Sequence, residues 1–111
     1  MIEICGDVIR LTRGDSATIS VAIANSVTGE DYVMQEGDKL LLTVRKYPSK
    51  ASAAVVEKEL TGGTVFRLAP EDTAGLDFGT YKYDVELRTG RDVYTVVPCS
   101  DFELLPEVTM T

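Results

Sequence analysis

A strict alternation of apolar and polar side chains between residues 81 and 88 constrains this chain more than any other feature. The apolar positions are Tyr81, Tyr83, Val85 and Leu87, and the polar positions are Lys82, Asp84, Glu86 and Arg88. A period of two with one apolar face is typical of a strand that covers a core on one side and meets solvent on the other. The pattern therefore predicts a long antiparallel strand whose sheet has one solvated face.

The residues that lead into this strand predict a specific corner. Asp77, Gly79 and Tyr81 have the spacing of the tyrosine corner of immunoglobulin-like sandwiches. In that corner the tyrosine hydroxyl bonds to backbone a few residues upstream. We therefore expect a structural role for these three residues, with Tyr81 donating the bond.

The rest of the chain is divided into short strands by turn residues. Strands are expected at 8–12, 16–25, 39–47, 55–60, 64–68 and 93–97. A last strand contains Phe102 and Leu104 and ends at Pro106. A minor strand is expected at 32–34 and one helical turn at 71–76. The Thr61-Gly62-Gly63 segment suits a hairpin connection. Seven to nine strands without an amphipathic helix predict one domain over residues 1–111, an all-β, immunoglobulin-like antiparallel β-sandwich.

Matching of side-chain faces predicts the register of the turn after Arg88. With Gly90 and Arg91 at its centre, apolar residues face one another: Leu87 faces Tyr94, and Val85 faces Val96. This register places Val93, Thr95 and Val97 on the outer, charged face of the sheet. These three residues are candidate partner contacts, together with the loop at 48–54, although isolated exposed apolar residues are also ordinary.

Composition argues against several classes of partner. The net charge is −7, and the 11 basic residues are thinly spread, so a nucleic-acid-binding surface is not expected. No run approaches the roughly 20 apolar residues of a membrane span, and the first residues lack the features of a signal peptide. Synthesis in the cytosol is therefore expected. Cys5 and Cys99 are interpreted as small buried thiols, with a disulfide between the first and last strands as the alternative.

The residue inventory does not favour catalysis, a metal or a cofactor. The absence of histidine removes the Ser-His-Asp and Cys-His pairs, histidine-based zinc sites and the usual general base. Asp72 and Asp77 are the nearest approach to a pair of catalytic acids, but they are better explained as a helix cap and a corner residue. We predict no catalytic, metal-binding or cofactor-binding residue.

Two short motifs invite other functions. Glu30-Asp31 and Glu36-x-Asp38 offer oxygen ligands but lack the alternating pattern of a dedicated calcium loop. Arg13-Gly14-Asp15 matches a short integrin-binding motif, yet a glycine between two charged residues at a strand connection first indicates a turn.

Several segments, taken in order, point to a narrower group of proteins. They are IRLTRGDS (9–16), GDKLLLTVR (37–45), LAPEDT (68–73), GTYKYDV (79–85), and a closing Phe102 with Glu107, Val108 and Thr109. This arrangement resembles the small β-sandwich modules of tailed phages and prophages and is similar to the N-terminal domain of upper baseplate proteins. The resemblance covers nearly the whole chain.

The resemblance implies a non-enzymatic structural module, made in the host bacterial cytoplasm and located in the virion after assembly. It implies docking on other virion proteins or on further copies of the chain, and leaves tail, baseplate and head accessory roles open. The alternative is a carbohydrate- or surface-binding module. Sugar recognition favours exposed aromatic rings, for which Tyr32, Tyr47 and Tyr94 are the candidates.

Overall fold

The computed structural model describes residues 2–5, 8–24, 28–47 and 51–107. Within these ranges the chain forms eight strands and one short helix. The elements are β1 (Ile2–Cys5), β2 (Val8–Thr12), β3 (Ala17–Ser20), β4 (Lys39–Arg45), β5 (Ala54–Thr61), β6 (Val65–Leu68), α1 (Pro70–Ala74), β7 (Gly79–Thr89) and β8 (Asp92–Leu105).

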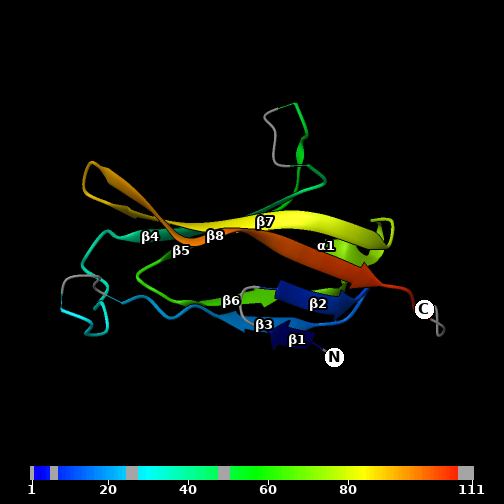
Figure 1. Cartoon of the computed structure of the whole chain (residues 1–111), viewed down its shortest axis with the longest axis horizontal. Coiled ribbons are helices and arrows are strands. Elements are labelled where there is room, and N and C mark those ends of the chain that lie inside the picture. The colour runs from blue at the N-terminus through cyan, green and yellow to red at the C-terminus, as the bar shows by residue number, and fades with distance from the viewer. Residues whose placement is uncertain (1, 6–7, 25–27, 48–50, 108–111) are drawn as a thin grey trace.

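The strands form two sheets. The larger has the order β1-β2-β8-β7-β4-β5, and the smaller pairs β3 with β6. Figure 1 shows that the larger sheet curls, so that β1 and β2 lie at the level of β3 and β6 while β7 lies in the opposite layer. The predicted all-β, sandwich-like fold is confirmed, with one difference: β2 runs parallel to β8, with Ile9 opposite Phe102, so the sheet is mixed.

The core lies between the layers, and the alternating strand supplies much of it. Tyr81, Tyr83, Val85 and Leu87 are all buried on the inner face of β7, as their period of two predicts. The rings of Tyr83 and Phe102 meet edge to face, with centroids 6.2 Å apart. Such aromatic pairs add about 1 kcal/mol beyond the area they bury.

The β7–β8 hairpin has the predicted turn. Thr89 pairs with Asp92, which leaves Gly90 and Arg91 at the centre, and Leu87 faces Tyr94. Gly90 has a φ of 57°, in the left-handed region that favours glycine. The sequence-based register is therefore confirmed at the tip of the hairpin.

Further along, β8 contains bulges that change the register. Val85 lies opposite Val97 instead of Val96, and Tyr83 lies opposite Ser100. Val97 therefore shares the inner face with Val85 and packs against the core. Its predicted position on the outer face is wrong, because a ladder without bulges was assumed.

The connection between β5 and β6 is not a hairpin. β5 pairs with β4 in the larger sheet, whereas β6 pairs with β3, so residues 62–64 carry the chain from one layer to the other. At this crossing the Gly62 N–H donates to the Asp38 carbonyl, 3.0 Å away.

Several other elements begin, end or exist differently from what the sequence predicts. No strand forms at 32–34, where the segment is held by the Tyr32 N–H donating to the Ile23 carbonyl at 2.8 Å. β3 ends at Ser20, before the predicted boundary at residue 25, and β8 is one continuous strand where two were expected. The sequence patterns also missed β1. The predicted helical turn is confirmed as α1.

Candidate functional site

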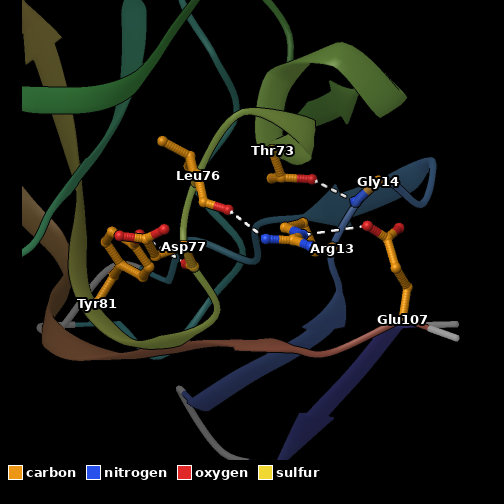
Figure 2. A network of polar contacts seen from close by, with 7 residues as sticks. All are labelled: Arg13, Gly14, Thr73, Leu76, Asp77, Tyr81 and Glu107. Carbon is orange, nitrogen blue, oxygen red and sulfur yellow. Dashed lines mark hydrogen bonds and ion pairs between the residues drawn. The ribbon is translucent and has the colours of Figure 1, made fainter. Parts of the chain in front are cut away.

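The start of β7 contains the hydrogen bond expected of a tyrosine corner. The Tyr81 hydroxyl donates to the Asp77 carbonyl oxygen at 2.7 Å (Figure 2). Gly79 has a φ of 143°, and a Cβ there would lie 3.3 Å from the Lys46 Nζ atom. That ammonium lies 4.7 Å from the centre of the Tyr81 ring. Burial raises the pKa of Tyr81, and the nearby charge of Asp77 raises it further.

Arg13 is held by the corner and by the segment after β8. Its Nη1 donates to the Leu76 carbonyl at 3.0 Å, and its Nε lies 3.2 Å from Glu107 Oε1 (Figure 2). The guanidinium also lies 5.4 Å from the centre of the Phe78 ring. Only 18% of this arginine side chain is exposed. The arginine of the short integrin-like motif is therefore part of an internal contact network.

The following glycine completes this network. The Gly14 N–H donates to the hydroxyl of the fully buried Thr73 in α1, at 2.8 Å. Gly14 has a φ of 84°, and the Asp15 N–H donates to the Thr12 carbonyl. The predicted turn at residues 13–15 is confirmed, and it is docked on α1.

The outer face of the larger sheet carries a charged groove across β5, β4 and β7. Its volume is about 690 Å³. Its lining includes the carboxylates Glu57, Glu59, Asp84 and Glu86, the cations Arg45, Lys58 and Arg88, and the residues Leu41, Leu42 and Thr43. Burial raises the pKa of the Asp84 carboxyl, as does the charge of Glu86, while Arg45 opposes the shift. The strand register puts the carboxylates in two rows, Glu57–Thr43–Asp84 and Glu59–Leu41–Glu86, with Arg45 and Arg88 beyond them.

Two of the three candidate contact residues continue this outer face onto β8. Val93 lies opposite Arg88 and is 57% exposed, and Thr95 lies opposite Glu86 and is also exposed. Val97, by contrast, faces the core. Val93, Thr95 and the charged groove together are named the outer face below.

A second hollow, named the interlayer cleft, is lined by residues of the β7–β8 hairpin, by residues 22–24 and by Tyr32. Its volume is about 500 Å³. It is lined by nine residues: Ala22, Ile23, Ala24, Tyr32, Leu87, Thr89, Tyr94, Thr95 and Val96. Two of the three tyrosines proposed as sugar platforms, Tyr32 and Tyr94, thus meet in one cleft. Tyr47 is 65% exposed and is not among its lining residues.

A buried carboxylate holds Tyr32 in place. Asp38, only 2% exposed, accepts hydrogen bonds from the Tyr32 hydroxyl at 2.6 Å and the Gln35 N–H at 2.9 Å. The bond from Tyr32 lowers the pKa of Asp38, and bonds from Gln35 and Thr89 add to the effect. The same bond raises the pKa of Tyr32. Asp38, considered above as a calcium ligand, therefore positions an aromatic ring.

The proposed pair of catalytic acids has structural contacts. The Asp72 carboxylate accepts a hydrogen bond from the Ala69 N–H at 2.7 Å and lies 2.9 Å from Lys58 Nζ. It thus caps the first turn of α1, as predicted, while Asp77 supplies its carbonyl to the corner. Within the described ranges, no three Asp, Glu, Cys or His residues are grouped as a metal site.

The cysteines do not behave as expected. Cys99 is a free and exposed thiol on β8, so its predicted burial is wrong, as is the alternative of a disulfide through Cys99. The side chain of Cys5 lies outside the described residues, as do residues 48–50 of the candidate contact loop. In the described part of the chain, no helix has the length and apolar character of a membrane span.

No family model matches this chain, and no curated protein matches its sequence.

Proposed function

We propose that this chain is a non-enzymatic structural module of a tailed-phage or prophage virion and that it acts by docking on neighbouring proteins. The observation that carries the docking proposal is the outer face, where exposed Val93 and Thr95 adjoin a groove of mixed charge. The virion assignment is supported by the sequence resemblance to phage β-sandwich modules. Tail, baseplate and head accessory positions are all compatible with it.

The outer face has properties that suit a protein partner. It lies on four hydrogen-bonded strands, β8, β7, β4 and β5, so its side chains are held in fixed positions. An apolar contact beside a charged region resembles the core and rim of protein interfaces. Charges in such a rim contribute mainly to specificity and to the rate of association.

The groove also indicates the chemistry of the partner. Four carboxylates, two arginines and Lys58 line it. Burial and the charge of Glu86 raise the pKa of Asp84, so negative charge at that carboxyl is disfavoured. A lysine or arginine from a neighbour would relieve that cost. The partner therefore presents basic side chains to the groove and an apolar side chain to Val93. The partner is another virion protein or a second copy of this chain.

The test is the incorporation of variants into purified particles. Val93→Asp should lower the amount of chain per particle by at least about tenfold, because a buried interface position tolerates an unpaired charge poorly. Val65→Asp is the matched control, since Val65 is an exposed valine on β6 in the other sheet. Circular dichroism would establish that both variants are folded.

Two results would contradict the proposal. One is that purified particles contain none of the unmodified chain. The other is that Val93→Asp and Val65→Asp enter particles equally well, which would exclude the outer face. Light scattering over a wide concentration range would separate self-association from docking on another protein.

A further inference from the structure

We infer that the interlayer cleft, which shares only Thr95 with the outer face, is a binding site for a neutral carbohydrate. Its lining residues come from the β7–β8 hairpin, which is at the left in Figure 1, and from residues 22–24 and Tyr32. At about 500 Å³ it lies within the usual range for small-ligand sites, roughly 300–1,000 Å³.

One wall of the cleft is a ring that is already fixed. Tyr32 is anchored through its hydroxyl to Asp38, which is itself held by the Gln35 N–H and by Thr89. These bonds restrict the ring before any ligand arrives. A preorganised platform reduces the entropic cost of binding.

The second aromatic wall comes from the hairpin. Tyr94 lies opposite Leu87, on the inner side of the sheet, and remains 54% exposed. Tyr94 and Tyr32 both line the cleft. Two aromatic side chains, each with an apolar ring and a polar hydroxyl, thus line one cleft. Such groups suit a ligand that combines apolar C–H faces with hydroxyl groups.

Charge and polarity select the class of ligand. None of the described residues that line the cleft is charged, and the chain as a whole carries a net charge of −7. A phosphate or an acidic sugar would find no cation there. The Tyr94 hydroxyl lies in the cleft, and the Tyr32 and Thr89 oxygens, whose protons are directed at Asp38, can still accept hydrogen bonds among apolar neighbours. A neutral mono- or disaccharide unit is therefore the occupant.

The test is a titration followed by nuclear magnetic resonance of the ¹⁵N-labelled chain. The probes are maltotriose, the N-acetylglucosamine trimer and lactose as neutral sugars, with sialyllactose as the acidic comparison. We expect saturable shifts for at least one neutral sugar, centred on residues of the interlayer cleft. Sialyllactose should bind more weakly than lactose, because its carboxylate has no counter-charge in the cleft.

Variants make the site assignment specific. Tyr94→Ala should weaken binding by at least about tenfold, whereas Tyr94→Phe should retain most of it because the ring remains. Tyr47→Ala is the matched control, since it removes an exposed tyrosine outside the cleft. Equal losses in Tyr94→Ala and Tyr47→Ala would contradict the assignment.

Other outcomes would overturn the proposal outright. Absence of saturable shifts with all three neutral sugars would do so, as would binding of sialyllactose alone. Shifts at the cleft that depend on protein concentration without sugar would assign the cleft to a second copy of the chain.

Discussion

The Nε atom of Arg13 lies 3.2 Å from Oε1 of Glu107, a residue 94 positions later in the chain. This pair joins the turn after β2 to the segment that follows β8. Because β2 and β8 also run parallel as neighbours, the pair extends their contact past the ends of the strands. The same guanidinium binds the Leu76 carbonyl, so one side chain connects three distant segments.

Arg13→Met should destabilise the fold by about 2 kcal/mol, because hydrogen bonds to a charged group in a partly buried site are lost together. Lys39→Met is the control, since Lys39 and Glu59 form an exposed pair at 3.3 Å. That substitution should cost less than about 0.5 kcal/mol. Denaturant unfolding measures both. Equal costs would mean that the Arg13 network adds no more than a surface pair.

Tyr81→Phe should keep the fold and lower the free energy of unfolding by about 1 kcal/mol, the usual net value of a buried hydrogen bond. The hydroxyl lost is the one that donates to the Asp77 carbonyl. Tyr47→Phe should have little effect, because that side chain is 65% exposed. A change near zero for Tyr81→Phe would show that the corner bond does not stabilise the fold.

Val97→Asp should destabilise the chain by about 2 kcal/mol or more, since the new carboxylate would be placed against the core. Val93→Asp should cost less than about 1 kcal/mol, because the side chain faces solvent on the outer face. Thermal and denaturant unfolding of the two variants would test the bulges in β8. If Val93→Asp destabilised the chain more than Val97→Asp, the result would support a register without bulges.

Asp72 should make stability depend on pH in the acid range. Burial alone would raise its pKa, but the bonds from the Ala69 N–H and Lys58 outweigh burial and lower the pKa below its ordinary value of 3.8. The folded state therefore binds the proton less tightly than the unfolded state. This contribution is complete well above 3.8 and is lost as the pH falls through the lower, folded value. Between about pH 7 and pH 3, the free energy of unfolding of Asp72→Asn should therefore fall less with decreasing pH than that of the unmodified chain.

Asp84 should act in the opposite direction. Burial and the charge of Glu86 raise its pKa, so the folded state binds the proton more tightly than the unfolded state. The charged form therefore opposes folding at neutral pH, and the penalty disappears as the pH falls below the ordinary value. Asp84→Asn should raise the melting temperature at neutral pH and have less effect in acid. A lower melting temperature at neutral pH would show that the carboxylate is stabilised by its neighbours.

Much of the fold could be predicted from side-chain alternation and turn residues. Alternation in residues 81–88 identified the inner face of β7 because each side chain in a strand points opposite to the next. Matching of faces identified Gly90 and Arg91 as the turn, since a turn centred on Thr89 and Gly90 would pair Leu87 with Asp92.

The remaining features depend on contacts that no local pattern encodes. Alternation assigns a residue to a face but does not say which sheet the strand joins, so β5 and β6 were wrongly paired. The bulges beside Pro98 shift the ladder without changing the composition, although a proline inside a strand is typical of a bulge. Tyr32 and Tyr94 meet only because loop and hairpin fold together, so the interlayer cleft could not be predicted.

The docking proposal is tested most directly by a cryo-electron microscopy map of tailed particles purified from cells in which this chain is made. The proposal predicts density for the chain with Val93 and the charged groove against a neighbouring protein. It also predicts a lysine or arginine of that neighbour near Asp84. A map in which the outer face points to solvent, or particles that lack the chain, would contradict the proposed function.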